Sequence, residues 1–403
     1  MPGVIHVAPG TFFAIIAAAA VAGTVSALAA DRKVVLPVVV LELVFGVLLG
    51  PQVGGLHANT FVNFISDLGL GLLFFFAGYE IDVRAIRGEP LRLAMFGWAM
   101  SLALAYAIGG ALAAAGVVLS LLYTGSALAT TALGMLIPIL SDTGELRSRL
   151  GTQVLAVGTV GEFGPILLLT LILSASGTVH NALILVAFVA LAVGVAVFAV
   201  RSSKRALPLL ERTLEHSSQL AVRWILVLVF ALALLAFELG LDLLLGGFAA
   251  GLITRQALQE QDEPAFDAKL KAVAFGVFVP FFFVVSGMEL DVAALFASAG
   301  GVAKLVVFFF LFLVVRGTPA LLLYRRVLEP RERAALALMS SAQLPMVLAV
   351  TTVARETGHM RASTAAALVG AAVLSTLVYP VLALRLRGDA VDPALAQAAE
   401  QAA

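Results

Sequence analysis

Long apolar runs separated by short polar segments recur over the whole 403-residue chain. Each run holds roughly 18 or more mainly apolar residues, enough for a helix to cross a hydrocarbon core about 30 Å thick. Backbone groups in lipid must be hydrogen-bonded internally, so such segments span as α-helices. The runs predict about thirteen spans, near residues 11–30, 34–50, 61–82, 90–116, 118–141, 148–174, 180–200, 220–237, 239–255, 266–289, 302–324, 333–355 and 362–385.

Composition supports the same class. Hydrophobic residues make up 61% of the chain, charged residues only 12%, and the mean hydropathy is +1.06. The sequence has no cysteine, which excludes disulfides, thiol catalysis and thiolate metal sites. Its net charge is zero and its basic residues form no stripe for nucleic acid. We therefore expect an all-α polytopic membrane protein, in contact with lipid, that binds no nucleic acid.

Most of the 25 lysines and arginines fall in the odd-numbered connections and in the C-terminal tail. The exceptions are Lys304, Arg316, Arg355 and Arg361. By the positive-inside rule the basic side is cytoplasmic, which predicts an N-terminus outside and a C-terminus inside. A miscounted span would scramble this alternation, so the charges support the count.

Two similar segments indicate an internal repeat. LLFFFAGYEIDVRAI at 72–86 matches FFFVVSGMELDVAAL at 281–295, and Gly78 aligns with Gly287 at an offset of 209 residues. They lie in the predicted third and tenth spans, an odd number apart, so they enter the membrane in opposite directions. This predicts an inverted-topology repeat of six spans on either side of a linking seventh. The expected parts are a first half with the linking span (1–200), a cytoplasmic linker (201–219), a second half (220–387) and a short cytoplasmic tail (388–403), with no soluble regulatory domain.

The fifth and twelfth predicted spans are polar and contain a proline. They read GSALATTALGMLIPILSD and LMSSAQLPMVLAV. Proline removes a helical N–H and crowds the carbonyl one turn back, so both helices can break near mid-membrane. Two kinked helices with hydroxyls bonded to their own backbone are the simpler alternative. Paired breaks in inverted halves instead point to a transporter's binding site, here lined by Thr130, Thr131, Pro138, Ser340, Ser341, Gln343 and Pro345.

Glu162 is the only ionisable side chain between Gly151 and Ser174, in the predicted sixth span. A charge at the bilayer centre costs several kcal/mol on insertion scales, and such residues usually handle ions or protons. Glu162 is thus the leading candidate for an ion and proton site. Two other acids are secondary candidates: Glu42 as a second proton site or a structural partner, and Asp67 as a packing or cavity-lining residue.

Several segments carry a family resemblance. ISDLGLGLLFFFAGYEIDVRAI, LSDTGELRSRLGTQVLAVGTVGEFGPI and FFFVVSGMELDV resemble the bacterial cation/proton antiporter superfamily. The closest likeness is to its second family, which includes sodium/proton antiporters and glutathione-gated potassium efflux systems. The resemblance covers essentially the entire chain. It implies a dimerisation domain, a mobile core domain and a homodimer in a prokaryotic cytoplasmic membrane. The resemblance also allows for a separate regulatory subunit.

The resemblance also assigns roles within the site. The family's signature in the sixth span, a carboxylate pair or Asn or Gln followed by Asp, corresponds here to Gly161 and Glu162, with glycine first and Glu in place of the usual Asp. By the same resemblance, a single carboxylate where some members have two implies electroneutral, one-for-one exchange. The family's basic residue in the eleventh span corresponds to Arg316. A guanidinium keeps its proton, so Arg316 is the counter-charge and Glu162 carries the proton.

The transported ions implied are Na⁺ or K⁺ and H⁺, with no cofactor and no transition metal. Hydroxyls of Thr130 and Thr131 and carbonyls freed at the helix breaks would complete an oxygen shell around a cation held by Glu162. Half-helix dipoles would point at the same place.

Two other kinds of transport protein remain as alternatives. A cation channel needs a continuous polar pore, whereas the polar residues here gather at one depth. A symporter of an organic anion and sodium shares broken, crossed helices but needs no acidic centre, so Glu162 argues against it. An enzyme finds no support, because the sequence offers no phosphate loop, metal-ligand cluster or nucleophile with a base.

Overall fold

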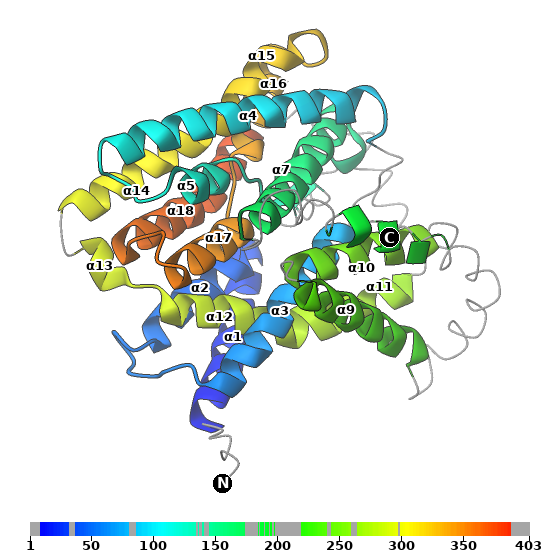
Figure 1. The fold of residues 1–403 in the computed structure, drawn as a ribbon, viewed down its shortest axis with the longest axis vertical. Helices are drawn as coiled ribbons and strands as arrows, with labels where there is room; N and C mark the ends of the chain where they lie inside the picture. The colour runs from blue at the N-terminus through cyan, green and yellow to red at the C-terminus, as the bar shows by residue number, and fades with distance from the viewer. Residues whose placement is uncertain are drawn as a thin grey trace. The chain divides into compact units, whose positions relative to one another are not determined.

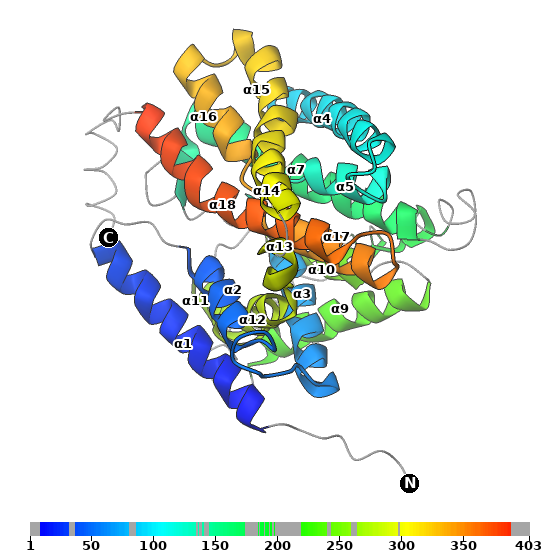
Figure 2. The same ribbon diagram turned by 90° about the vertical axis from the view of Figure 1, so that its left-hand side faces the viewer.

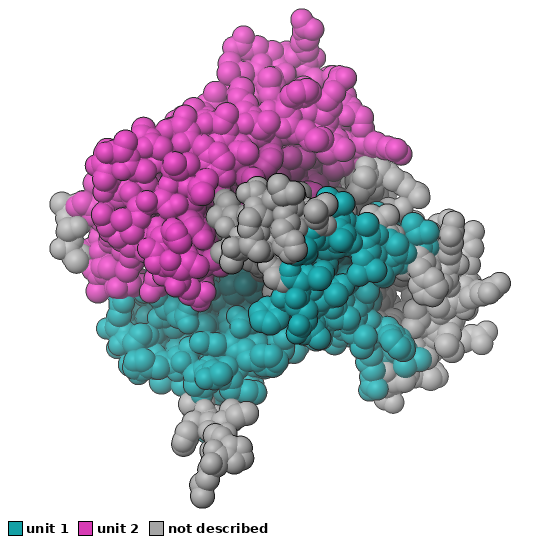
Figure 3. All heavy atoms as spheres, viewed as in Figure 1, with its two compact units in different colours: residues 1–81, 170–290 teal, residues 82–169, 291–403 magenta. Residues whose placement is uncertain are grey.

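A computed structural model describes residues 9–31, 37–79, 86–133, 136, 139–140, 145–173, scattered positions between 184 and 197, 219–239, 243–258, 264–296 and 299–387. All regular elements within these residues are helices, which confirms the all-α prediction. The chain divides into two compact units, each assembled from two separate stretches of sequence (Figure 3). Unit 1 comprises residues 1–81 and 170–290, and unit 2 comprises residues 82–169 and 291–403.

Seven helices in the described part of the chain are long and apolar enough to cross a membrane. This agrees with a polytopic membrane protein, while the count of thirteen spans stays a prediction. The predicted linker before Gln219 and the tail after Arg387 lie outside the described residues. The seven helices are Pro9–Ala29, Thr60–Tyr79, Glu89–Ala114, Asp267–Glu289, Gly300–Arg326, Pro330–Glu356 and Ala362–Arg387.

Unit 1 is built around two helix pairs. Helix α3 packs along α10, and α12 packs along α2. The elements of the unit are α1 (Pro9–Asp31), α2 (Val38–Leu49), α3 (Thr60–Tyr79), α9 (Leu220–Glu238), α10 (Leu243–Leu258), α11 (Pro264–Val273), the π-helix η2 (Ala274–Phe278) and α12 (Val279–Glu289).

The two glycines that align in the repeat serve the same purpose in these pairs. A Cβ on Gly78 would collide with the backbone carbonyl of Phe248 on α10. A Cβ on Gly287 would collide with the carbonyl of Leu43 on α2. Each glycine therefore lets its helix approach a neighbouring backbone closely. An inverted repeat predicts these two matching contacts, because the packing of the third span on the ninth corresponds to the packing of the tenth span on the second.

Unit 2 contains the two interrupted helices, and both units draw on both predicted halves of the sequence. Helices α14 and α15 continue one another as a rod, and α18 crosses behind α14 (Figure 2). The elements are α4 (Glu89–Ala114), α5 (Leu121–Leu128), η1 (Glu145–Arg147), α7 (Arg149–Leu173), α13 (Val292–Phe296), α14 (Ala299–Phe312), the π-helix η3 (Leu313–Gly317), α15 (Thr318–Leu323), η4 (Tyr324–Arg326), α16 (Pro330–Ser340), α17 (Pro345–Glu356) and α18 (Ala362–Arg387).

Both predicted helix breaks are present, one of them away from its proline. The twelfth span is interrupted between Ser340 and Pro345, and Pro345 opens α17, where its missing N–H is harmless. The fifth span leaves its helix after Leu128 and is non-helical over 129–132. This break precedes Pro138, which lies outside the described residues, so Pro138 does not locate it.

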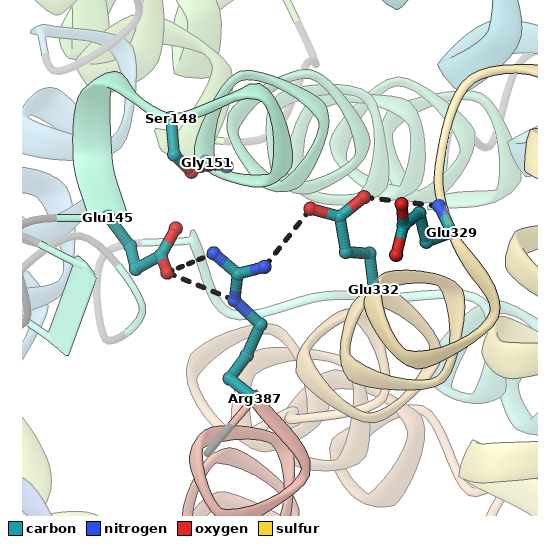
Figure 4. Close-up of polar contacts among 6 residues, drawn as sticks. All are labelled: Glu145, Ser148, Gly151, Glu329, Glu332 and Arg387. Carbon is teal, nitrogen blue, oxygen red and sulfur yellow. Dashed lines mark hydrogen bonds and ion pairs between the residues drawn. The ribbon is translucent and has the colours of Figure 1, made fainter. Parts of the chain in front are cut away.

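An ion-pair network joins the ends of three helices in unit 2 (Figure 4). The Arg387 guanidinium, at the end of α18, donates to Glu145 Oε1 from Nε at 3.0 Å and also pairs with it through Nη2. Its Nη1 donates to Glu332 Oε1 at 3.0 Å. Glu332 in turn accepts from the backbone N–H of Glu329, in a capping box that starts α16. Ser148 accepts from the Gly151 N–H at 2.9 Å and so caps the first turn of α7.

We predict that Arg387→Met lowers the thermal stability of the purified protein. Glu145 is only 8% exposed and would lose its cation. Breaking a fully buried pair costs about 3–5 kcal/mol, and the partial exposure of this one reduces the expected loss to about 1–2 kcal/mol. Thermal unfolding in detergent measures the change. Arg385→Met, at an exposed position of the same helix, is the control, and an equal effect of both variants would contradict the prediction.

Candidate functional site

The two helix breaks of unit 2 bond directly to one another. The Thr131 hydroxyl donates to the Ser340 carbonyl at 2.6 Å, and the Ala132 N–H donates to the Ala342 carbonyl at 2.9 Å. Residues 131 and 340 are 209 apart, the same offset that relates Gly78 to Gly287. Backbone groups left open in one half of the repeat are thus satisfied by the other half.

Gln343 forms a second connection between the breaks. The Thr130 hydroxyl lies 2.8 Å from Gln343 Oε1, and Gln343 Nε2 donates to the Leu128 carbonyl at 3.3 Å. Thr130 and Gln343 are 1% and 0% exposed. The backbone of Gln343 is held by α18, where Ser375 Oγ accepts from its N–H at 3.1 Å and Thr376 Oγ1 donates to its carbonyl at 3.1 Å.

The remaining predicted residues of the twelfth span are buried and mainly structural. The Ser341 hydroxyl donates to the Ala337 carbonyl at 2.6 Å, one turn back in α16. Pro345 is buried at the start of α17. The simpler expectation, hydroxyls bonded to their own helix, therefore describes Ser341 but not Thr131.

Glu162 lies in α7 beside these breaks and is 5% exposed. Its helix contains Pro165, which has no N–H to donate to the Gly161 carbonyl four residues earlier. That carbonyl accepts instead from the Thr131 N–H at 3.0 Å. A proline thus attaches the helix of Glu162 to the break in the fifth span, and Pro165 was a signal in the sequence that our reading missed.

Gly161 makes room for the cationic side chain. A Cβ at this position would overlap Arg316 Nη2 and would lie 2.8 Å from Thr131 Oγ1. Arg316, 2% exposed, therefore lies against the backbone of α7 immediately before Glu162. The missing side chain of Gly161 leaves the space that the guanidinium and Thr131 approach.

The Arg316 guanidinium donates three hydrogen bonds, each to an uncharged oxygen. Nε donates to Thr131 Oγ1 at 2.9 Å, Nη1 to Ser101 Oγ at 3.2 Å and Nη2 to the Val157 carbonyl at 3.2 Å. These acceptors come from the fifth-span break, α4 and α7. A buried cation needs such a shell, and here it fixes the guanidinium beside Gly161.

Two serine hydroxyls contact backbone carbonyls at and next to Arg316. Arg316 is on the π-helix η3, a form that often marks functional sites. Ser101 Oγ donates to the Val315 carbonyl at 2.9 Å, four residues before Pro319, which lacks the N–H to do so. Ser340 Oγ lies 3.3 Å from the Arg316 carbonyl. Ser101 is fully buried, and its sequence position, alone among apolar residues of α4, gave no hint of this partner.

The carbonyls at the end of α5 differ from our expectation of free cation ligands. The Ala127 carbonyl lies 3.1 Å from Thr130 Oγ1, the Leu128 carbonyl accepts from Gln343, and the Ala129 carbonyl accepts from Trp98 Nε1 at 3.1 Å. The Leu128 and Ala129 carbonyls thus already have a protein donor, as backbone acceptors in a dry interior nearly always do.

The two secondary candidates lie in unit 1, apart from the unit that contains Glu162. Glu42 is 4% exposed on α2. Asp67 is exposed on α3. Unit 2 contains Thr130, Thr131, Gly161, Glu162, Arg316, Ser340 and Gln343. The contacts described above join these residues except Glu162, which directly follows Gly161 in the chain.

A family model described as "Sodium/hydrogen exchanger, transmembrane" matches residues 15–384. The chain belongs to the sodium/hydrogen exchanger family. This confirms the resemblance found in the sequence and identifies a transporter family, not an enzyme. The exchanger is also a multi-pass membrane protein, as its long apolar helices indicate.

Named relatives agree with this family. The exchanger is 26% identical over 271 residues to "Probable Na(+)/H(+) antiporter 3" of Methanocaldococcus jannaschii, a match that covers 66% of this chain and 68% of that protein. It is 26% identical over 276 residues to the Na(+)/H(+)-K(+) antiporter GerN of Bacillus cereus, covering 65% of this chain and 68% of GerN.

A solved structure shares the fold. The sodium proton antiporter MjNhaP1 from Methanocaldococcus jannaschii, solved at pH 8, superimposes with a TM-score of 0.67 at 15% identity. The match covers 93% of the exchanger and 98% of MjNhaP1. At this identity the likeness shows the fold, which is that of an antiporter.

We predict that Gly161→Ala destabilises the exchanger. The added methyl group would push Arg316 and Thr131 out of their hydrogen bonds, and overpacking of this kind typically costs about 1–3 kcal/mol. Gly110→Ala on α4 is the control, because a Cβ there meets no atom within 4 Å. Thermal unfolding in detergent should show a lower midpoint for Gly161→Ala only; equal midpoints for the two variants would refute this.

Proposed function

We propose that the protein exchanges a monovalent cation, Na⁺ or K⁺, for H⁺, and that Glu162 binds the two in turn. Family membership and the antiporter names of the relatives support the exchange. The observation that carries the assignment to Glu162 is its position: a buried carboxylate in α7, next to the point where two broken helices meet. An intramembrane acid at a break between half-helices is the expected form of an ion-coupled site.

Competition at one carboxylate explains the coupling. Protonation removes the negative charge that compensates a cation for the loss of its water, so a proton and a cation exclude one another. Arg316 cannot carry the proton, because a guanidinium stays charged. It supplies a fixed positive charge, held by Thr131, Ser101 and Val157.

The same two charges favour one-for-one exchange. With Glu162 ionised, the charges of Glu162 and Arg316 sum to zero. A bound proton and a bound monovalent cation each raise that sum to +1. The two loaded forms therefore carry equal charge across the membrane in opposite directions, and the net charge moved in a cycle is zero.

The hydroxyl of Thr130 is the best second ligand for the cation. It is buried, and an oxygen that donates its proton to Gln343 keeps lone pairs for a cation. Thr131 contributes less directly, because its oxygen already donates to Ser340 and accepts from Arg316. We assign Thr131 to holding the counter-charge.

Alternating access follows if unit 2 moves as one body, because it contains the complete site. We further propose a homodimer in a prokaryotic cytoplasmic membrane, with the N-terminus outside and the C-terminus inside, as the basic residues favour. Membership of an exchanger family weighs against the organic-anion symporter and the cation channel.

We predict that Glu162→Gln abolishes exchange. The amide can neither take up nor release a proton in this pH range, so a Na⁺ or K⁺ pulse should move no protons in liposomes containing a trapped pH dye. Glu162→Asp keeps a carboxylate and should retain part of the activity, and Glu238→Gln, at an exposed position, should match the wild type. Wild-type rates in Glu162→Gln would refute the assignment.

We also predict that membrane potential leaves the exchange rate unchanged. Potassium or lithium gradients with selective ionophores can set the potential on the same liposomes while the transported ion gradient is held constant. A one-for-one exchange should respond by less than about twofold over 100 mV, although that voltage is worth about 2.3 kcal/mol per charge moved. A rate that scales with voltage would show net charge movement.

A further inference from the structure

One helix of unit 2 contributes to the site through a residue that neither family nor sequence motif singles out. Trp98 on α4 precedes Ser101 by one helical turn, so both face the same side. Ser101 holds Arg316, and Trp98 donates its indole N–H to the Ala129 carbonyl at 3.1 Å. Helix α4 runs past α5 in Figure 1, and these two bonds connect it to both the counter-charge and the end of that broken helix.

The Trp98 ring is also wedged against the helix of Glu162. A Cβ at Gly164, two residues beyond Glu162, would lie 2.7 Å from Trp98 Cη2, so the ring rests on the bare backbone of α7. The indole thus fills the space between α7 and the Ala129 carbonyl. Its position is fixed at both ends, by a hydrogen bond and by the missing side chain of a glycine.

Trp98 differs in chemistry from the other groups that cap α5. The Ala127 carbonyl faces the Thr130 hydroxyl and the Leu128 carbonyl faces the Gln343 amide, and both of those side chains also contain acceptor oxygens. An indole N–H only donates. It cannot turn an oxygen toward a cation, it uses one of the two lone pairs of the Ala129 carbonyl, and its positive edge lies beside that oxygen, so it weakens the Ala129 carbonyl as a cation ligand.

We propose that Trp98 determines cation selectivity and favours Na⁺ over K⁺. The inference rests on the proposed binding of the cation at Glu162. Selectivity between these ions depends on cavity size or on the number and field strength of the ligands. Trp98 bears on both, because its ring fills the space against Gly164 on α7 and its N–H takes one lone pair of the Ala129 carbonyl. Among the described residues the strong-field oxygens of Glu162 and Thr130 then dominate the proposed shell, which suits the smaller ion.

Trp98→Phe tests the proposal, since it removes the N–H and part of the ring while keeping an aromatic side chain. The measurement is the ratio of half-saturating K⁺ to half-saturating Na⁺ for proton movement in liposomes. We expect this ratio to fall at least about fivefold in Trp98→Phe and to stay at the wild-type value in Trp224→Phe, whose side chain is 62% exposed on α9. A ratio within twofold of the wild type in an active Trp98→Phe protein would overturn the proposal.

A binding measurement covers the case in which Trp98→Phe does not fold or transport. The chain has two tryptophans, so Trp224→Phe leaves Trp98 as the only indole fluorophore. We expect Na⁺ to change its emission at several-fold lower concentration than K⁺. Equal responses to the two ions, or no response to either, would overturn the proposal.

Glu162→Gln distinguishes failure of this inference from failure of the proposed function. In the Trp224→Phe background it should abolish the emission change. If Glu162→Gln stops exchange but Trp98→Phe leaves the ion ratio unchanged, only the role of Trp98 is refuted. If Glu162→Gln exchanges normally, the cation site itself has been misassigned.

Discussion

Two helices that stop inside an apolar protein leave backbone N–H and C=O groups that water cannot reach, and the architecture of unit 2 depends on satisfying them. An unpaired backbone group in a membrane interior costs several kcal/mol. The breaks solve this mutually: Thr131 donates to Ser340, and Ala132 donates to Ala342. Because each break completes the other, neither is stable alone. An inverted repeat supplies the second break automatically at the matching depth.

Prolines outside the breaks extend the same principle to the neighbouring helices. Pro165 leaves the Gly161 carbonyl open for the Thr131 N–H, and Pro319 leaves the Val315 carbonyl open for the Ser101 hydroxyl. In each case a missing helical bond is replaced by a bond to another element. These substitutions attach the helix of Glu162 and the helix of Arg316 to the crossing point. The arrangement of the site therefore depends on satisfying backbone hydrogen bonds as much as on charged side chains.

The buried guanidinium gives the site its electrostatic character. Arg316 bonds to three neutral oxygens and lies where Gly161 has no side chain. Its charge is permanent, so in the proposed exchange the net charge of the site follows the occupancy of Glu162. The polar shell that makes this tolerable comes from several elements at once. One turn away from Ser101 on α4, Trp98 donates to the Ala129 carbonyl at the end of α5.

The sequence by itself determined the membrane class, the helix breaks and the lone acid of the sixth span, because hydrophobic length, proline and an isolated charge are local signals. It also related Gly78 to Gly287 through their matching segments, and in the structure both glycines meet a neighbouring backbone that leaves no room for a Cβ. Only the tertiary structure decided that the fifth-span break begins after Leu128, ahead of Pro138, because a partner 209 residues away fixes it. It alone assigned Ser101 and Trp98 to the site. The sequence does not show which way a serine or a tryptophan of an apolar helix points. Only packing against distant helices brings Ser101 to Arg316 and Trp98 to the Ala129 carbonyl.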